Sequence, residues 1–597
     1  MSSNAATTNG MSSPTATAGP ESIPRDHLLT PLLRAAAEFP DSPLASIRRG
    51  KRFLDISSTD LLARVRELAK GLIIAGITPG DRVALMSKTS LEWFITDCAI
   101  VAVGAVTVPI YETSSPTQVE WILEDSGASM LIVGTEVMKH AVASVVAGTT
   151  TCSRDTVVIA SGGLETLSHG GRTVDDATLD ATIAAISPDD MATIMYTSGT
   201  TGRPKGCVLT HHNLRANVHQ ISDALAGTVH ATDTCLLFLP LAHILTKSAA
   251  LFCLEHRIRI AFATSLKELP EEFLLAKPTL IAAVPRIFEK VYARAQNQAE
   301  AARKGPIFKR AADVAVRWSQ QNQTGTPSLP LRIEHGIYDR LVYRKIRDAF
   351  GGELRMSFSG GGPLGARLTS FFDGTGVRIY EGYGLTETSP ILTLTRAAGW
   401  TPGSVGAAVR DTTLTLADDG EILAQGPQVF SGYWHNDDAT ADSFDEQGRF
   451  HTGDIGQFDA AGALHIVGRS KDLIVTAAGK NVAPAPLEDL LKAHGLISQA
   501  MVVGDGRPFI AALITLDEDA MKEWSEHHDS SELDAVIQLA VDDVNKTVSR
   551  AESIRKFEVL PHDFDLTSGE ITPTLKVRRA VIVAHYAGVI DSLYDTP

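Results

Sequence analysis

The stretch Tyr196-Thr-Ser-Gly-Thr-Thr-Gly-Arg-Pro-Lys205-Gly206 places four Ser/Thr hydroxyls and three glycines around one lysine. It follows an apolar run over residues 192–195 that predicts a buried strand. Glycines let several backbone N–H groups approach one anion, hydroxyls donate further hydrogen bonds, and lysine adds a positive charge. The stretch therefore predicts a loop that holds phosphate.

Two other interpretations of this loop are disfavoured. A Walker A loop requires Gly, four residues and then Gly-Lys-Ser/Thr. Here Pro204 precedes Lys205 and Gly206 follows it, so the spacing argues against a P-loop kinase or GTPase. A flexible Gly/Ser linker has no need of a fixed Pro-Lys pair and would lie between polar stretches.

Composition limits the classes of function. The chain has 597 residues, which predicts more than one domain, and a hydrophobic content of 44% predicts large cores. A net charge of −16 argues against non-specific binding of nucleic acid, which needs clustered Lys and Arg. The five cysteines have no metal-binding or CxxC spacing, which predicts free thiols in a reducing cytoplasm: Cys98, Cys152, Cys207, Cys235 and Cys253.

Neither a secretory signal nor a membrane span is expected. Residues 1–20 are mostly Ser, Thr, Ala, Asn and Gly without Lys or Arg, which predicts a disordered tail. The longest apolar stretch, residues 94–110, contains Asp97. At that length and with a charge, it predicts a buried helix followed by a strand.

Strand-like and helix-like runs alternate over residues 50–390. A helix is expected over 58–72, and strands are expected over 82–86, 106–110, 130–133 and 156–160. This alternation predicts an α/β architecture with mostly parallel sheets. Residues 289–350, broken at 325–330, are rich in Ala, Arg, Lys, Gln and Glu and predict helices on the surface. A solvated face is favoured there over a membrane-docking site, which stays open as an alternative.

The pattern changes at Gly468-Arg-Ser-Lys-Asp472, which lies between two apolar strands. A compact α+β pattern follows, with a helix over 486–494 and a hairpin around Asp505-Gly506. The expected organisation is a tail over 1–20, a large N-terminal domain over 21–467, a hinge over 468–472 and a small C-terminal domain over 473–597.

A second motif, Tyr380-Glu-Gly-Tyr-Gly-Leu-Thr-Glu-Thr-Ser389, begins on a predicted strand and continues into a glycine-rich loop. Tyr383 offers a flat face for a purine, Thr386 a hydroxyl for phosphate, and Glu387 a hard oxygen ligand for Mg²⁺. A purely structural turn is less favoured, because loops at strand ends commonly carry ligand sites.

Together these motifs resemble those of the adenylate-forming (AMP-binding) superfamily, which includes acyl-CoA synthetases, luciferases and adenylation domains. The resemblance covers most of residues 50–580. It includes Ser359-Gly-Gly-Gly-Pro-Leu364, His451-Thr-Gly-Asp454 and Pro573-Thr-Leu-Lys576. It implies an α/β fold with a large multi-sheet adenylation domain and a small mobile α+β C-terminal domain.

The resemblance also implies the site residues. A nucleotide site would comprise Thr197, Ser198, Gly199, Thr200, Thr201, Gly202, Lys205, Gly361, Gly362, Pro363, Glu381, Gly382, Tyr383, Gly384, Thr386, Asp454, Arg469 and Lys576. Asp454 would accept hydrogen bonds from both ribose hydroxyls. Glu387 and Thr197 would hold Mg²⁺, and Lys576 would reach the carboxylate and the α-phosphate. The catalytic set would be Lys576, Glu387, Thr197 and His243.

Other positions are implied in the acyl and CoA regions. His243, in Leu239-Pro-Leu-Ala-His-Ile244, would line an acyl pocket with Gly361 and Gly384, although a buried histidine satisfied by a backbone carbonyl is an equal alternative. Val284-Pro-Arg286 resembles another pocket-side segment. Lys471 would lie at the hinge, and Gly479 and Lys480 on the CoA side.

The expected reaction is ATP-dependent conversion of a long-chain fatty acid, through an acyl-adenylate, to acyl-CoA with release of AMP and pyrophosphate. ATP, Mg²⁺ and CoA would be required. The long-chain assignment rests on Thr-Leu-Lys576, where many short-chain relatives have Ser-Gly-Lys, on Leu-Ala-His243 and on the surface helices. The presence of Thr-Leu-Lys576 instead of Ser-Gly-Lys also counts against control by acetylation of Lys576. The enzyme is expected in the cytoplasm, as a monomer or homodimer, with peripheral contact at the inner membrane face left open.

Two alternatives remain. A fatty acyl-AMP ligase that delivers its acyl group to a carrier protein often carries an insertion after the hinge, and none lies between Asp472 and Ala483. A non-catalytic lipid- or nucleotide-binding protein would be expected to lose Lys576 or Glu387, and both are present.

Overall fold

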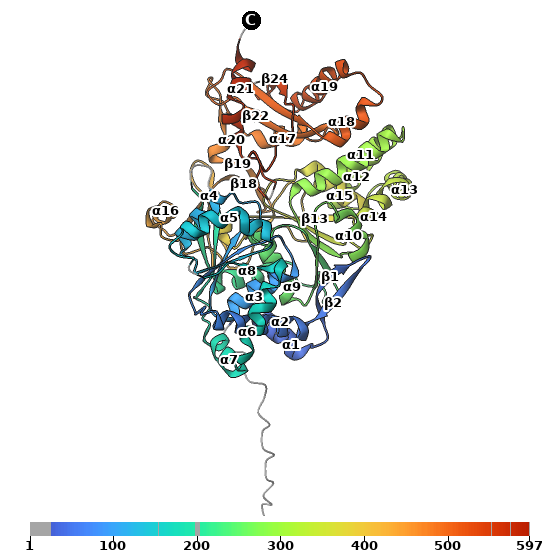
Figure 1. Cartoon of the computed structure of the whole chain (residues 1–597). Helices are drawn as coiled ribbons and strands as arrows, with labels where there is room; N and C mark the ends of the chain where they lie inside the picture. Colours follow the sequence, from blue (N-terminus) through green and yellow to red (C-terminus); the bar gives the residue numbers. More distant parts are fainter. Residues whose placement is uncertain (1–25, 153, 198–202, 551, 574, 596–597) are drawn as a thin grey trace, which may run out of the picture.

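The computed structural model describes residues 26–152, 154–197, 203–550, 552–573 and 575–595. The expected tail over 1–20 lies outside them. A large N-terminal unit built on three sheets carries a small C-terminal unit at one end (Figure 1). Within the described residues, no helix is both long enough and apolar enough to cross a membrane.

The first sheet of the large unit has six strands in the order β6-β5-β3-β4-β7-β8. Its strands are parallel except for the pair β7 and β8. The strands are β3 Arg82–Met86, β4 Val106–Ile110, β5 Met130–Val133, β6 Val157–Val158, β7 Met191–Thr197 and β8 Lys205–Thr210. The helices of this part are α1 Thr30–Glu38, α2 Ser58–Ile74, α3 Leu91–Ala102, α4 Pro116–Ser126, α5 Glu136–Gly148, α6 Gly163–Gly170, α7 Asp176–Ala185 and α8 His211–Ala224.

The second sheet has nine strands in the order β15-β14-β13-β12-β11-β9-β10-β1-β2, parallel from β13 to β1. The strands are β1 Pro43–Arg49, β2 Arg52–Ser57, β9 Thr234–Leu237, β10 Arg259–Phe262, β11 Leu280–Ala283, β12 Met356–Ser359, β13 Arg378–Gly384, β14 Ile391–Leu394 and β15 Ala407–Ala408. Its helices are α9 Ile244–Glu255, α10 Leu269–Ala276, α11 Pro285–Ala301, α12 Gly305–Thr324, α13 Leu329–Tyr338, α14 Arg344–Ala349 and α15 Ala366–Thr375.

A third, antiparallel sheet completes the large unit, and the C-terminal unit follows it. The third sheet contains β16 Thr413–Leu416, β17 Glu421–Gln425, β18 Phe450–Phe458 and β19 Leu464–Arg469, and α16 Asp437–Ala441 lies between β17 and β18. The C-terminal unit contains β20 Ile474–Val475, β21 Asn481–Val482, β22 Ile497–Val503, β23 Ile510–Leu516, β24 Ile554–Val559, α17 Pro484–Leu491, α18 Glu518–Ser525, α19 Leu533–Asn545, α20 Arg579–His585 and α21 Ala587–Tyr594.

The predicted elements agree with the structure except at some ends. The strand expected over 156–160 is only β6, because the chain turns into a 3₁₀ helix at Ile159. The helix expected over 486–494 is α17, which begins two residues earlier. Pro484 occupies its first turn, where a fixed φ favours helix and the missing N–H costs nothing. The hairpin expected at Asp505-Gly506 joins β22 and β23.

The two large sheets share one apolar core. Side chains from both sheets and from α2, α3, α8 and α9 form a single buried cluster, so helices fill the space between the sheets. Trp93 of α3 is fully buried there. A chain of this length can bury a core large enough to dominate its stability.

One buried ion pair explains the charge inside the apolar run. Asp97 lies in the middle of α3, and Lys247 of α9 donates to its two carboxylate oxygens at 2.7 and 2.5 Å. Both residues are buried, and the ammonium lies 5.9 Å from the ring centre of Trp93. Each charge therefore compensates the other away from water.

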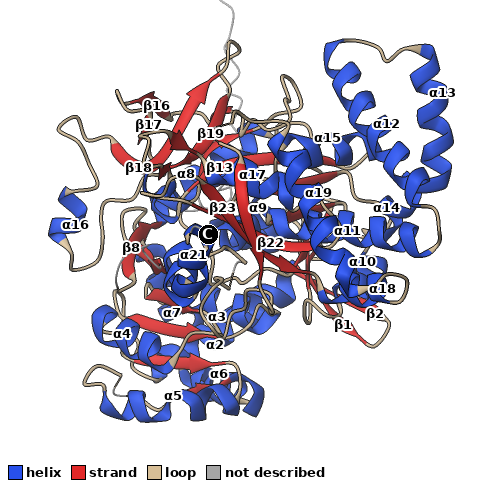
Figure 2. Ribbon diagram, turned by 90° about the horizontal axis from the view of Figure 1, so that it is seen from above, coloured by secondary structure: helices blue, strands red, loops and turns tan. Residues whose placement is uncertain are grey.

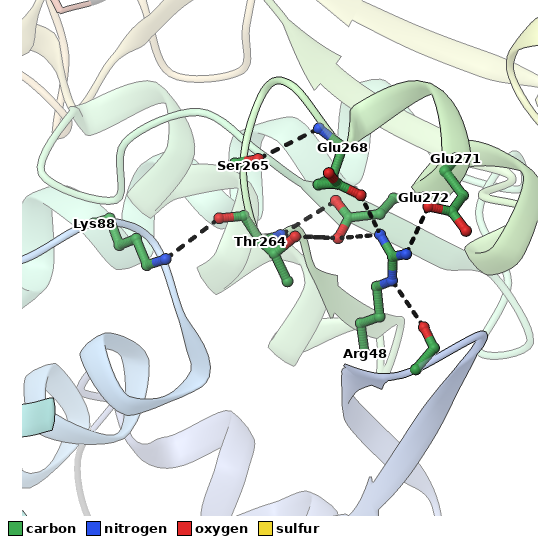
Figure 3. Close-up of polar contacts among 8 residues, drawn as sticks. Arg48, Lys88, Thr264, Ser265, Glu268, Glu271 and Glu272 are labelled. Atoms are coloured by element: carbon green, nitrogen blue, oxygen red, sulfur yellow. Dashed lines mark hydrogen bonds and ion pairs between the residues drawn. The ribbon is translucent and has the colours of Figure 1, made fainter.

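A polar network connects the two large sheets near the carboxyl ends of β1, β3 and β10 (Figure 3). Arg48 of β1 donates to Glu271 of α10 at 2.6 Å and lies 3.5 Å from Glu272. Glu272 is fully buried and accepts from the backbone N–H and the hydroxyl of Thr264. Lys88, which follows β3 in the first sheet, donates to the carbonyl of Thr264 at 3.5 Å.

Replacing Lys247 by Met should destabilise the N-terminal unit by about 3–5 kcal/mol, because it leaves the Asp97 carboxylate buried without a counter-charge. The shift of the unfolding transition in urea measures this loss. Lys546→Met is the matched control, since Lys546 pairs with Asp543 on the surface, and it should cost less than about 1 kcal/mol. Equal losses of unfolding free energy in the two variants would contradict the assignment of Asp97 and Lys247 as a buried ion pair. Adding Asp97→Leu to Lys247→Met should restore most of the stability.

Candidate active site

A cavity of about 1920 Å³ lies where the three sheets of the large unit meet the C-terminal unit. Most of the predicted site residues line it, although they come from distant parts of the chain: Thr197, His243, Gly361, Gly362, Pro363, Glu381, Gly382, Tyr383, Gly384, Thr386, Glu387, Asp454, Arg469, Lys471 and Lys576. The topology thus gathers these motifs around one space.

The predicted phosphate loop connects the antiparallel strands β7 and β8. Thr197, the last residue of β7, is the register partner of Lys205, the first residue of β8. The two strand ends that flank the loop therefore lie side by side, and Thr197 lines the cavity. The predicted residues Ser198, Gly199, Thr200, Thr201 and Gly202 lie outside the described residues.

Tyr433 is a site residue that the sequence motifs missed. Its hydroxyl donates to a carboxylate oxygen of Glu387 at 2.8 Å, and the ammonium of Lys205 lies 4.9 Å from the centre of its ring. Tyr433 therefore connects the end of the phosphate hairpin to the predicted metal ligand. It lies 46 residues beyond Glu387 in the chain, and no local pattern marks it.

Gly384, the last residue of β13, allows the backbone of Pro390 to approach closely. A Cβ atom at this position would lie 1.6 Å from the carbonyl oxygen of Pro390, so no other residue fits. The 3₁₀ turn Thr386–Thr388 then presents Glu387 to the cavity. Cys207 lies buried beside Glu387, and the pKa of its thiol is well above the usual value because of burial and this neighbouring carboxylate.

The ribose-side predictions converge on Asp454. Asp454 of β18 and Arg469 of β19 are register partners, and their side chains form an ion pair at 3.2 Å. The hydroxyl of Tyr383 donates to the second carboxylate oxygen of Asp454 at 2.9 Å. Burial raises the pKa of Asp454, while Arg469 and Tyr383 oppose that shift. Tyr383 is itself buried and lines the cavity.

Lys576 reaches the cavity from the C-terminal unit. A Cβ atom on Gly361 would lie 3.4 Å from Cε of Lys576 and 3.8 Å from its nitrogen, so the side chain lies against the glycine loop that follows β12. Protein surrounds the ammonium, although water in the open cleft still reaches the residue. This burial and the nearby Arg469 lower the pKa of Lys576 to about 8, and Asp454 and Glu387 counteract them.

A tight hairpin presents Lys576. Its backbone N–H donates to the hydroxyl of Thr572, and its carbonyl accepts from the N–H of Thr572. Leu575, directly before the lysine, has φ +61°. This is a left-handed backbone conformation that residues other than glycine rarely adopt. Leucine therefore occupies a backbone conformation that suits the glycine of the Ser-Gly-Lys form.

His243 lines the cavity and also has a backbone partner, which is an N–H group and not the carbonyl that the alternative expected. Its Nδ1 accepts a hydrogen bond from the backbone N–H of Leu245 and caps α9, and the residue also lines the cavity. Burial, followed by the charge of Lys576, lowers the pKa of His243 to about 3. The imidazole is therefore neutral at physiological pH and lies near Lys576.

Glu381 has a structural partner. Its buried carboxylate accepts from the hydroxyl of Thr369 on α15 at 2.9 Å, and burial raises its pKa. The carboxylate thereby joins β13 to the helix that follows the glycine loop. Gly479 and Lys480 do not line the cavity in this arrangement of the described residues. Lys480 instead lies 3.6 Å from Glu552.

Contacts between the two units were also missed. Arg286, at the start of α11, donates to the carbonyl of Ser498 at 2.5 Å and to its hydroxyl at 2.6 Å. Lys492 lies 2.9 Å from Glu289 of α11 and 3.0 Å from Asp489 of α17. These side chains come from both units and hold the C-terminal unit against the cavity. Their long separation in sequence leaves no local signal.

Comparisons with known sequences identify the family. The sequence profile of AMP-binding enzymes matches residues 32–434, and that of the AMP-binding enzyme C-terminal domain matches residues 471–597. A Mycobacterium bovis protein named long-chain-fatty-acid–CoA ligase FadD15 is 47% identical over 91% of this chain and 92% of its own length. Human long-chain-fatty-acid–CoA ligase ACSBG1 is 30% identical over 94% of this chain and 84% of its own length.

Solved structures have the same fold. The crystal structure of the ATP-bound RpMatB–BxBclM chimera B1 has a TM-score of 0.73 at 23% identity and covers 94% of this chain and 99% of its own. The adenylation domain of a carboxylate reductase from Mycobacterium chelonae has a TM-score of 0.77 at 23% identity, covering 95% of this chain and 91% of its own. The predicted α/β fold with a large adenylation domain and a C-terminal domain is confirmed. The chain belongs to the family of AMP-binding enzymes.

Proposed function

We propose that this protein is a long-chain fatty acid–CoA ligase that forms acyl-CoA through an acyl-adenylate. The observation that carries this proposal is Lys576, a lysine of the C-terminal unit that lies in the cavity of the large unit beside Gly361. The substrate class rests on relatives that are named long-chain-fatty-acid–CoA ligases.

In the first half-reaction, a carboxylate oxygen of the fatty acid attacks the α-phosphorus of ATP. A new oxygen–phosphorus bond forms. The bond between the α-phosphorus and the oxygen that bridges to the β-phosphate breaks, and pyrophosphate leaves. Negative charge spreads over the phosphate oxygens in the transition state. Lys576, next to the glycine loop and near Glu387 and Asp454, would stabilise that charge electrostatically. No protein nucleophile is required, because positioning supplies much of the rate.

We assign the nucleotide to the surfaces around Lys576. Asp454, oriented by Tyr383 and Arg469, would accept the ribose hydroxyls. The β7–β8 hairpin with Lys205 would hold the phosphates, together with Thr386. His243, Gly361 and Gly384 would line the acyl end of the site.

The donor set at Glu387 fits Mg²⁺. Mg²⁺ is usually bound by one or two carboxylates, waters and substrate phosphates rather than by an all-protein cage. Glu387, with Thr197 near it, supplies such a partial set. Among the described residues, no group of three or more His, Cys, Asp or Glu side chains could hold a metal by itself. When bound, the ion would neutralise phosphate charge, and Tyr433 would fix the orientation of the Glu387 carboxylate.

In the second half-reaction, the CoA thiol gives its proton to water and its sulfur attacks the acyl carbon of the adenylate. A carbon–sulfur bond forms, the bond from the acyl carbon to the phosphate oxygen breaks, and AMP leaves. We propose that the C-terminal domain, residues 473–597, rotates about a hinge over 468–472 that includes Lys471. This rotation would withdraw Lys576 and bring Gly479 and Lys480 to the CoA side.

We place the enzyme in the cytoplasm, as a monomer or homodimer, with at most peripheral contact at the inner membrane face. All five cysteines are free and buried, in keeping with a reducing compartment.

A panel of saturated fatty acids, assayed with ATP and with or without CoA, tests the proposed function. AMP, pyrophosphate and acyl-CoA should form together, with a maximum for long chains, and acyl-CoA should require CoA. Accumulation of acyl-AMP that never reaches CoA would instead indicate transfer to a carrier protein. If no acid yields AMP, the protein is not a ligase of fatty acids.

Lys576→Ala should abolish adenylate formation but retain thioester formation from supplied acyl-AMP, because the lysine serves only the first half-reaction. We expect a loss of at least about 100-fold in pyrophosphate release, as for the loss of one electrostatic group at a transition state. Lys471→Ala, at the hinge, is the control and should not show the same selectivity. An equal fall in both half-reactions for Lys576→Ala would contradict domain alternation.

The adenylation step should also depend on pH through Lys576. The lysine carries its proton below its pKa of about 8 and loses it above. The kcat/KM for pyrophosphate release without CoA should therefore fall roughly tenfold per pH unit above pH 8. Lys576→Arg should be slower but free of this fall, because arginine keeps its charge. The same fall in the arginine variant would assign the pH dependence to another group.

A further inference from the structure

Large apolar side chains form an exposed row along the outer face of α13 and the turn after it. Leu329, Ile333, Ile337 and Leu341 are 67%, 60%, 53% and 52% exposed. They are spaced four residues apart, so they lie on the same side of the helix. A surface helix of a globular protein normally turns such a stripe toward the core, and here the stripe faces solvent.

The rest of this outer face is mainly basic, and Asp348 is the one exposed acid among residues 329–349. Arg332, Arg340, Arg344 and Lys345 are exposed. Within the part of the chain that the structure describes, none of the four forms an ion pair. The acids Glu334 and Asp339 are half-buried and paired with arginines of the same helical layer. A chain with a net charge of −16 thus carries a locally cationic and apolar face.

The inner side of the same segment is firmly packed. The ring of His335 stacks on Trp318 of α12 with centres 3.9 Å apart, and its Nε2 is bonded to the carbonyl of Gly374. The hydroxyl of Tyr343 donates to the carbonyl of Ala311 at 2.7 Å. The hairpin of α12 and α13 projects from the side of the molecule (Figures 1 and 2). An ordered helix therefore presents the outer face on a protrusion.

We propose that this face, formed by Leu329, Ile333, Ile337, Leu341 and the four cations around them, docks on the surface of an anionic phospholipid bilayer. An apolar stripe flanked by Arg and Lys is the pattern of helices that lie in the membrane interface. The cations are attracted to the headgroups while the leucines and isoleucines enter the acyl boundary.

Charge argues against a second copy of the chain as the occupant. A two-fold symmetric contact places the same surface patch on both sides of the interface. It would oppose the four cations of one copy to those of the other, and like charges in contact are unfavourable. An anionic bilayer has the opposite charge and also accepts the apolar row.

The face belongs to the helical layer that forms part of the cavity wall. Helix α11 begins at Pro285 in that wall, and α12 packs on α11 and on α15, which follows the glycine loop over 360–365. Docking would hold the cavity close to a bilayer in which long-chain acids dissolve. This use of the face rests on the proposed function, whereas the docking itself rests on the face alone.

Vesicle co-sedimentation of the full chain tests the proposal. Vesicles of phosphatidylcholine with phosphatidylglycerol should bind the protein, and vesicles of phosphatidylcholine alone should bind it at least about tenfold more weakly. Added salt should weaken the binding. The double variants Ile333→Ser with Ile337→Ser, and Arg340→Ser with Arg344→Ser, should each lose about tenfold or more in affinity.

Matched controls change equally exposed residues elsewhere. Val137→Ser with Leu539→Ser removes two exposed apolar side chains from α5 and α19, and Arg64→Ser with Lys139→Ser removes two exposed cations from α2 and α5. These controls should bind vesicles like the unchanged protein. The proposal would be overturned if the control variants lost as much vesicle affinity as the α13 variants. It would also be overturned if the unchanged protein did not bind anionic vesicles.

Two further readouts separate the alternatives. Light scattering without vesicles measures the oligomeric state, and a dimer that the α13 variants convert to a monomer would show a contact between copies and overturn membrane docking. With fatty acid supplied in anionic vesicles the α13 variants should turn over more slowly, and with acid supplied on albumin they should match the unchanged protein. An inactive protein that still binds vesicles would refute the proposed function but not the docking.

Discussion

The arrangement of this enzyme depends on bringing the positive charge of Lys576 from the C-terminal unit into the cavity of the large unit. Burial and Arg469 work against the ammonium, and Asp454 and Glu387 support it. The contacts of Arg286 with Ser498 and of Lys492 with Glu289 hold the C-terminal unit in place at the wall of the cavity. A bound polyphosphate would add negative charge beside the lysine, so nucleotide binding and closure of the C-terminal unit would each favour the other.

The parts of the fold that were predictable from sequence are those with strong local signals. Strands buried in parallel sheets appear as short continuous apolar runs, and β3, β4 and β5 match their predicted bounds for that reason. Element ends were less predictable, because they depend on single residues such as Pro484. Asp97 appeared in the sequence only as an interruption. Its partner Lys247 lies 150 residues away, and no local pattern relates the two.

Within the site too, residues with a local sequence signal were predictable and residues that depend on long-range contacts were not. Residues in glycine-rich motifs were found because close approach of the backbone to a ligand or to another chain segment requires glycine, as at Gly384 and Gly361. Tyr433 and Lys492 were not found, and Arg286 was noticed only as part of a pocket-side segment, because the contacts of all three are created only in the folded chain. His243 could not be assigned to one role from sequence, and the structure shows that the same side chain caps a helix and lines the cavity.

The lowered pKa of Lys576 has a chemical consequence for the enzyme itself. An amine with a pKa of about 8 is partly uncharged at neutral pH, and an uncharged amine is a nucleophile. An acyl-adenylate is a mixed anhydride, which amines attack to give stable amides. A lysine that remained beside the intermediate it helped to form would compete with the CoA thiol and become permanently acylated. Carrying this lysine on a separate unit allows it to be removed from its own product, so the two-unit architecture would also protect the enzyme from self-inactivation.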